Sequence, residues 1–252
     1  CYFMATSGLF DPYIDKWKKV KMTSEGAMRT LAKLFLNNLY GKMASSTDSS
    51  FKVAYKDEKG VHFKGVEAHD KPIGYIAIGS AITSYARNFT IRTAQKNFYG
   101  ANERGFIYAD TDSIHCDLKP EELKGIKVDN NAFCCWKLES CWDAAIFARQ
   151  KTYIEHVTKE NLESIDNPYY NVKCAGMPDR SKELFIDSLT GRIRQDYKYT
   201  EDELAFIEKK RELEDFKVGL IVPGSLKPRR IPGGIVLVNG FYEMRPNLSV
   251  MR

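Results

Sequence analysis

Two aspartates one residue apart are the residues of this sequence best suited to chemistry. Asp110 and Asp112 interrupt a run of apolar residues, where unpaired carboxylates are costly to desolvate. Two carboxylates this close also repel each other, and a bound divalent cation relieves that repulsion. Magnesium suits such a site because it prefers oxygen ligands and binds through one or two carboxylates together with substrate phosphates. An ordinary solvated Asp-Thr-Asp turn is the alternative.

A second group of polar residues follows helical spacing. It comprises Arg29, Lys33, Asn37 and Tyr40. Residues four or three positions apart share one face of a helix. On that face Arg29 and Lys33 are suited to bind the phosphates of a triphosphate, and Tyr40, followed by Gly41, offers a planar surface for a base. A solvated basic face on an ordinary amphipathic helix is the alternative.

Lys151 and Tyr153 form a third pair, in an alternating segment. Side chains two residues apart point to the same face of a strand, so the segment predicts a cation beside a hydroxyl. That pair is suited to the end of a nucleic-acid strand. Alternation of lysine and tyrosine on an ordinary protein surface is the other interpretation.

The elements that must position these residues are predicted from periodicity. A helix is predicted over residues 23–44, capped by Thr23 or Ser24, and a second over 73–99. Residues 45–71 alternate and predict a β-hairpin insertion with a turn at 57–60. Strands at 105–109 and 113–116 enclose the acidic turn. The predicted apolar stripe of the first helix is Met28, Leu31, Leu34, Phe35 and Leu39. That of the second helix is Ala81, Tyr85, Phe89 and Ala94.

Further along, helices are predicted over 131–149 and 201–214 and strands over 151–157 and 235–238, with Pro-Gly and Lys-Pro pairs between them. No regular alternation of strand and helix is present, so the predicted fold class is α+β with antiparallel strands.

The composition sets limits on the class of protein. Of 252 residues, 43% are hydrophobic and 28% charged, which argues against disorder, collagen and coiled coil. No apolar run reaches the roughly 18–20 residues that a membrane span needs. The six cysteines show no paired CxxC spacing, which argues against a zinc site and predicts reduced thiols in a cytosol-like compartment. Because the chain begins with Cys1, we expect a processed chain or a piece of a longer one.

The charge is unevenly distributed. The formal net charge is +5, and both ends of the chain are basic, whereas residues 181–215 are net acidic. Two basic ends are suited to hold a phosphate backbone from two sides, although a charge of this size permits a polyanionic partner without requiring one.

Three segments resemble, in the family's order, motifs of family B DNA polymerases. Residues 33–41 resemble the fingers motif Lys-x-x-x-Asn-Ser-x-Tyr-Gly, residues 108–113 match the palm motif Tyr-x-Asp-Thr-Asp-Ser, and residues 151–153 match Lys-x-Tyr. Further stretches resemble the protein-primed polymerases of phage type, namely residues 6–10, 23–27, 173–177, 216–219 and 232–234.

The resemblance implies a right-hand polymerase fold that is incomplete. It implies a palm edge and fingers helices at 1–44, a hairpin insertion like the second terminal-protein region at 45–72, a palm with an antiparallel sheet at 73–180, and a small thumb at 181–252. Residues 181–215 are longer than is usual in such a thumb.

The resemblance also implies roles for single residues in template-directed nucleotidyl transfer with two Mg²⁺ ions and dNTP substrates. Asp112 is the expected direct metal ligand. Asp110 is expected to contribute the electrostatic field of its carboxylate and occasional coordination of the metal. Lys33 is expected to hold the triphosphate. The other implied contacts are Asn37 and Tyr40 for the nucleotide, Lys151 and Tyr153 for the primer end, and Arg29, Lys16 and Lys21 for phosphates.

Two departures from the family pattern leave a rival interpretation open. Asn38 stands where serine is usual, and the second palm motif, Asp-x-x-Ser-Leu-Tyr-Pro, is absent, as are recognisable exonuclease motifs. We therefore expect a complementary N-terminal polymerase part as partner, besides primer-template DNA and a terminal-protein primer, and inactivity of this chain alone. Host-cell cytoplasm, or an organelle for a linear plasmid, is the expected location. The rival is a non-catalytic DNA-binding or assembly subunit that kept the polymerase fold.

Overall fold

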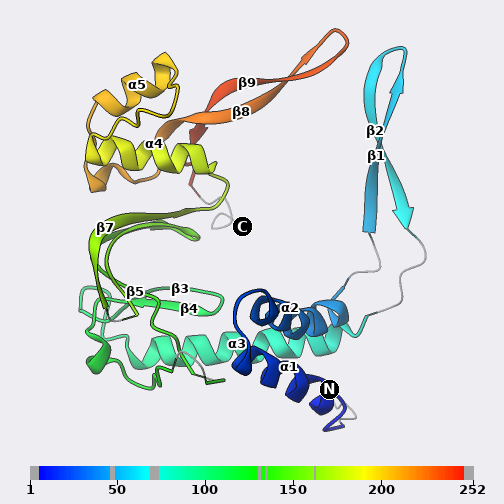
Figure 1. The fold of residues 1–252 in the computed structure, drawn as a ribbon, viewed down its shortest axis with the longest axis vertical. Coiled ribbons are helices and arrows are strands. Elements are labelled where there is room, and N and C mark those ends of the chain that lie inside the picture. Colours follow the sequence, from blue (N-terminus) through cyan, green and yellow to red (C-terminus); the bar gives the residue numbers. More distant parts are fainter. Residues whose placement is uncertain are drawn as a thin grey trace. The chain divides into compact units, whose positions relative to one another are not determined.

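The computed structural model describes residues 6–45, 49–68, 74–129, 132, 133, 135–161 and 163–246 (Figure 1). The chain divides into two compact units. The N-terminal unit comprises Cys1–Tyr55 and His62–Trp136, and the C-terminal unit comprises Lys56–Val61 and Lys137–Arg252. The division falls inside the segment predicted as palm, and the predicted domain borders stay predictions.

Two helices packed on each other begin the described chain, α1 (Asp11–Thr23) and α2 (Gly26–Met43). The Trp17 ring stacks on Phe35 with centroids 4.2 Å apart, and the Tyr13 hydroxyl donates to the Phe35 carbonyl at 3.1 Å. The predicted capping of the second helix is wrong. Thr23 is the last residue of α1, its hydroxyl donates to the Lys19 carbonyl, and α2 begins without a side-chain cap.

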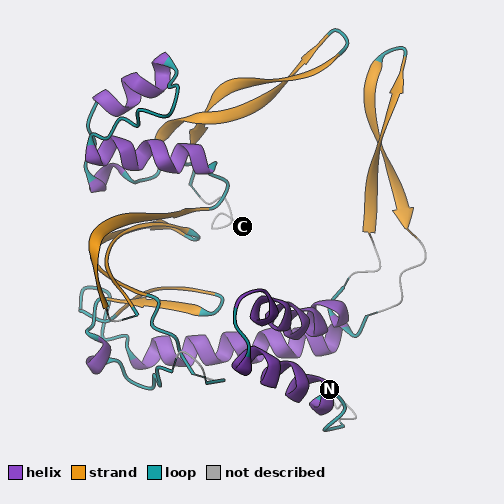
Figure 2. Ribbon diagram, viewed as in Figure 1, coloured by secondary structure: helices purple, strands orange, loops and turns teal. Residues whose placement is uncertain are grey.

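The hairpin predicted from alternation is present as β1 (Ser49–Asp57) and β2 (Gly60–Ala68) (Figure 2). In its turn the Lys59 N–H donates to the Asp57 carboxylate at 2.8 Å, and Gly60 has a φ of +122° that favours glycine. Its described apolar side chains, such as Val53 and Phe63, are exposed. Residues 46–48 and 69–73 of the predicted insertion lie outside the described residues.

Helix α3 (Ile76–Lys96) and the hairpin of β3 (Phe106–Asp110) and β4 (Ser113–Cys116) confirm three further predicted elements. The first residue of the predicted helix, Ile73, lies outside the described residues. The strands pair antiparallel and join at the acidic turn, and a short 3-10 helix, Pro120–Glu122, follows them.

The apolar stripes predicted for α2 and α3 are mostly not core. Leu34 on α2 is 52% exposed and Tyr85 on α3 is 77% exposed. Phe89 contacts Trp136 in a ring stack of 5.4 Å but is still half exposed. Among the described residues of these helices, Ala32 and Ala94 are the buried apolar ones. The helical spacing was right, but no described element covers most of these faces.

The C-terminal unit contains a three-stranded antiparallel sheet in the order β5 (Ser140–Arg149), β6 (Thr152–Glu160), β7 (Glu163–Cys174). The helix predicted over 131–149 is therefore wrong: residues 140–149 form β5, and the described residues 132, 133 and 135–139 form no helix. Residues 131 and 134 lie outside the described chain. Strand β5 pairs along β6, with Ala145 opposite Glu155 and Ile146 opposite Ile154. This pairing along β6 overrides the helix propensity of the alanine-containing segment.

Two helices cover the end of this sheet, α4 (Asp179–Thr190) and α5 (Glu201–Glu208), followed by a 3-10 helix at Leu213–Asp215. The predicted helix over 201–214 thus ends early. One core joins sheet and helices, with Ile154, Leu184, Phe185, Phe216, Val222 and Met244 fully buried.

The chain ends in the ribbon β8 (Ile221–Ile231) and β9 (Gly234–Glu243), which extends away from α4 (Figure 1). Strand β8 contains Pro223 and Pro228, which the sequence analysis placed between the predicted elements. A proline is tolerated there because a two-stranded ribbon leaves both outer edges without a ladder partner. All named strand pairs with a described register are antiparallel, which confirms the α+β fold class. In the part of the chain that the structure describes, no helix is both long and apolar enough to cross a membrane.

Candidate active site

The acidic turn lies at the tip of the β3–β4 hairpin. Asp110 ends β3 and is partly buried, opposite Ser113, whereas Asp112 is exposed in the turn. Between them Thr111 has a φ of +50°, which is uncommon for a residue other than glycine. The Thr111 hydroxyl donates to the Asp110 carboxylate at 3.0 Å, and the Ser113 hydroxyl donates to the Asp110 carbonyl at 3.1 Å. These bonds hold the tight turn that carries both aspartates.

A buried threonine of α3 supports this turn from beneath. The Thr90 hydroxyl lies 3.0 Å from the Thr111 carbonyl and donates to it or to the Ala86 carbonyl of its own helix. Thr90 is only 5% exposed. Sequence reasoning missed Thr90, because its contact joins residues 21 apart and follows no local motif.

The far end of the same hairpin is fixed by Asn97 and Gly105. The fully buried Asn97 amide donates to the carbonyls of Thr93 and Lys124 and accepts from the Lys124 N–H, so its polar atoms are satisfied. The backbone carbonyl of Asn97 accepts from the Phe106 N–H at 2.7 Å. A Cβ on Gly105 would lie 2.3 Å from that carbonyl, so glycine is required. The hairpin is therefore held both at its turn and at its far end.

The carboxylates fit one side of a magnesium site. Asp110 and Asp112 supply carboxylate oxygens, the type of ligand that Mg²⁺ prefers. Within the described ranges, however, no cluster of three or more His, Cys, Asp or Glu residues converges.

A cluster of three cations forms where α1 packs on α2. Burial lowers the pKa of Lys21, and the positive charges of Lys33 and Arg29 lower it further. The Lys21 ammonium also lies 4.6 Å from the centre of the Phe133 ring. The structure thus brings Lys21 to Arg29 and Lys33, which the sequence had placed together on one helix face.

The remaining predicted nucleotide contacts lie on the same helices. Asn37 and Tyr40 are exposed on α2, one and two turns beyond Lys33. Lys16 is exposed on α1, with its ammonium 5.1 Å from the Trp17 ring centre. Lys16 is not among the charges that lower the pKa of Lys21.

Lys151 and Tyr153 lie in the C-terminal unit, at the start of β6. Tyr153 is a strand residue whose ring lies 5.4 Å from Phe147. The strand position predicted for Lys151 is wrong, since it precedes β6 in the turn and has a φ of +56°. Arg149 pairs with Thr152, so only two residues connect the strands, and such a short turn demands left-handed backbone.

Comparison with known proteins decides the family. The family described as DNA polymerase type B, organellar and viral, matches residues 1–131, about half of the chain. The chain belongs to the type B DNA polymerases. This result confirms the resemblance inferred from the three motifs.

Phage polymerases are similar along nearly the whole chain. The DNA polymerase of Bacillus phage PZA is 38% identical over 96% of this chain, and that of Bacillus phage phi29 is 37% identical. A solved structure of phi29 DNA polymerase with primer-template DNA has a TM-score of 0.70 at 36% identity, and one with incoming nucleotides has a TM-score of 0.69. This chain spans 39% of the length of these relatives. Its fold is therefore that of a partial polymerase.

Proposed function

We propose that this chain is the C-terminal part of a DNA-directed DNA polymerase and takes part in template-directed nucleotidyl transfer. The observation that carries the proposal is the supported pair Asp110 and Asp112 in a chain of the type B family. In the reaction the primer 3′-hydroxyl loses its proton and attacks the α-phosphorus of a dNTP. A new phosphorus–oxygen bond forms, and the bond to the leaving pyrophosphate breaks.

Asp112, exposed at the tip, is the proposed direct ligand of Mg²⁺, and Asp110 adds negative potential and a second oxygen. When bound, two Mg²⁺ ions neutralise charge on the attacking and leaving oxygens. Thr111 holds the Asp110 carboxylate and Thr90 holds the backbone of the turn, so little reorganisation of the turn is needed when substrate arrives.

The cation cluster is the proposed triphosphate site. Lys21, Arg29 and Lys33 bring three positive charges together before any substrate binds, and a triphosphate compensates their mutual repulsion. Asn37 and Tyr40 are proposed to contact the incoming nucleotide from the same helix. Lys16 is proposed as a further phosphate contact.

Lys151 and Tyr153 are proposed to hold the primer end. Lys151 is an exposed residue of the turn before β6. Tyr153 is anchored in β6 beside Phe147, so its hydroxyl is held on a rigid element.

A complementary N-terminal polymerase part is the proposed partner, with the missing carboxylate and the exonuclease. Two observations support it: the chain spans 39% of its phage relatives, and the described faces of α2 and α3 expose large apolar side chains such as Leu34 and Tyr85. Exposed apolar faces of this kind mark surfaces that another chain covers.

The finer assignments follow the phage relatives. We propose palm edge and fingers for 1–44, a processivity hairpin for 45–72, palm for 73–180 and thumb for 181–252. Priming by a terminal protein, and replication in the cytoplasm of a host cell, are proposed on the similarity to phage polymerases.

Primer extension tests the proposal. The chain alone is expected to extend no primer, and extension is expected once the polypeptide with the missing palm motif is added. That polypeptide is identified from the mass and sequence of whatever co-purifies with the chain. Robust extension by the chain alone would contradict the need for a partner. A stable complex that binds DNA but extends nothing would favour the non-catalytic assembly subunit, since the described residues present only one side of a metal site.

A further inference from the structure

A single tyrosine hydroxyl joins three strands of the C-terminal unit beside the turn that carries Lys151. The Arg149 guanidinium of β5 donates to the Tyr242 hydroxyl of β9 at 3.0 Å. The Cys174 sulfur of β7 lies 3.3 Å from the same oxygen. Tyr242 is 93 residues from Arg149 and 68 from Cys174 along the chain. The hydroxyl therefore connects the ribbon of β8 and β9 to two strands of the three-stranded sheet.

The two partners of Tyr242 flank the first residue of β6. Thr152 pairs with Arg149 of β5 on one side and with Cys174 of β7 on the other. Thr152 is fully buried, and Lys151 directly precedes it in the turn. Arg149 and Cys174 thus lie at the level of the sheet where the residues proposed to hold the primer end begin.

A backbone hydrogen bond ties the Lys151 turn to the end of β7. The Ala175 N–H donates to the Lys151 carbonyl at 3.0 Å. Ala175 directly follows Cys174, so a displacement of Cys174 also displaces the group that holds the backbone of Lys151. Lys151 has a φ of +56°, a conformation that a residue other than glycine keeps only where its surroundings enforce it. The turn therefore depends on the contacts that fix its flanks.

Tyr242 is itself held firmly by the base of the ribbon. It pairs with Val222 of β8, which is fully buried, and its side chain packs against the core. Two residues further on, Met244 is also fully buried. The Met244 N–H donates to the Leu220 carbonyl, and its carbonyl accepts from the Gly219 N–H, both at 2.8 Å. The hydroxyl therefore stands at a fixed position to which the turn is attached.

The hydroxyl can satisfy both of its partners at once. A tyrosine hydroxyl carries one proton to donate and lone pairs that accept. It accepts from Arg149, and its own proton remains for the Cys174 sulfur. Burial and the contact with Cys174 raise the pKa of Tyr242 to about 12, against the opposing charge of Arg149. The hydroxyl therefore keeps its proton, and both contacts, at neutral pH.

We propose that Tyr242 is a positioning residue for the primer end, which it orients through the Lys151 turn. The inference rests on the proposed function, in which Lys151 and Tyr153 hold that end. It gives the base of the ribbon a role in aligning the primer that needs no contact between Tyr242 and DNA. A satisfied polar group at the edge of a core, with no effect on substrate, is the ordinary explanation for such a hydroxyl. The experiment separates the two.

The test is steady-state primer extension by the complex of this chain with its complementary part, with primer-template and dNTP varied separately. Tyr242→Phe removes the hydroxyl and keeps the ring in place. The KM for primer-template is expected to rise about fivefold, while kcat and the KM for dNTP stay within about twofold. Tyr199→Phe is the matched control. The Tyr199 hydroxyl accepts from the Arg194 N–H at 3.0 Å and packs against the same core, so its loss should change neither KM.

A double-variant cycle tests whether Tyr242 acts through Lys151. In a complex that already carries Lys151→Ala, the further change Tyr242→Phe is expected to alter the KM for primer-template by less than about twofold, because the contact to be positioned is gone. A purely structural hydroxyl would instead add its full effect in both backgrounds. The melting temperature of each variant shows separately what the hydroxyl contributes to stability.

The outcomes separate this inference from the proposed function. If the unmodified complex extends primers and Tyr242→Phe leaves the KM for primer-template unchanged, the inference alone is overturned. Equal increases in both KM values, or independent effects of Tyr242→Phe and Lys151→Ala, make Tyr242 a structural residue and overturn it as well. If the unmodified complex extends no primer, the proposed function fails and this inference falls with it.

Discussion

The two compact units differ in how they hold their parts in place. The C-terminal unit has a continuous core in which Ile154, Phe185 and Phe216 are fully buried. In the N-terminal unit, Ala32 and Ala94 are the buried apolar residues among those described. The N-terminal unit nevertheless carries the acidic turn and the three-cation cluster.

Local devices replace a core in the N-terminal unit. A buried threonine supports the turn, a satisfied asparagine fixes the base of its hairpin, and a ring stack of Trp17 on Phe35 joins α1 to α2. Such contacts keep individual side chains in place but bury little apolar area. The comparison teaches that the acidic turn and the three-cation cluster lie in one unit, whereas the continuous apolar core lies in the other.

The largest effect is expected from Asp112→Asn in the complex with the complementary part. The change removes a proposed metal ligand, so primer extension should fall at least a hundredfold, about 2.7 kcal/mol of barrier. Duplex binding should stay unchanged or tighten, since a negative charge near phosphates is lost. Asp166→Asn, the same change at an exposed strand position, is the control. Extension within tenfold of the unmodified enzyme would reject Asp112 as an essential ligand.

Two truncations test the difference in burial directly. Phe216→Ala removes a fully buried ring that packs 5.3 Å from Phe185 and should lower the free energy of unfolding by about 3–5 kcal/mol. Leu34→Ala on the exposed face of α2 should cost below about 1 kcal/mol in the isolated chain. Urea unfolding followed by tryptophan fluorescence measures both. Equal losses would show that the N-terminal unit has a core comparable to that of the other unit.

Single cations from the two units should affect different substrates. Lys33→Ala is expected to raise the KM for dNTP about tenfold, and Lys151→Ala the KM for primer-template by a similar factor, because one charge-assisted contact contributes about 1.5–3 kcal/mol. Steady-state kinetics of the complex, with each substrate varied separately, distinguish them. The assignment fails if both variants change the same KM.

The smallest effect on single turnovers is expected from replacing Ser49–Ala68 by a short linker. The described part of this hairpin exposes its apolar side chains, so its removal should leave single-nucleotide addition within about twofold of the unmodified complex. Products per binding event should shorten, and strand displacement should weaken. Extension through a downstream blocking strand, in the presence of a DNA trap, measures both. Unchanged products would make the segment an ordinary surface loop.

The sequence by itself determined the features that depend on near neighbours. Asp110 and Asp112 lie between two short segments that were predicted as strands. That local pattern was sufficient to predict their position at a hairpin tip. Arg29, Lys33, Asn37 and Tyr40 share a helix face because helical geometry fixes the spacing. The motifs were contiguous, and for that reason the family was recognisable before the fold.

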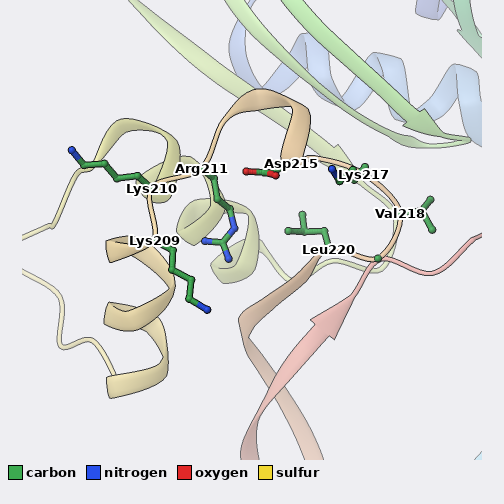
Figure 3. A pocket seen from close by; sticks show the side chains of 8 residues that line it. Lys209, Lys210, Arg211, Asp215, Lys217, Val218 and Leu220 are labelled. Carbon is green, nitrogen blue, oxygen red and sulfur yellow. The ribbon is translucent and has the colours of Figure 1, made fainter.

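Only the tertiary structure decided which distant residues act together. Lys21 joins Arg29 and Lys33 because α1 packs on α2, and Thr90 meets the acidic turn because α3 runs beneath it. Residues 140–149 became a strand because β6 offered a ladder of backbone hydrogen bonds that local propensity does not include. Lys209, Lys210 and Arg211 belong to the net acidic stretch 181–215, yet they line one hollow together with Lys217 (Figure 3). Packing, and not spacing along the chain, selects which charges share a surface.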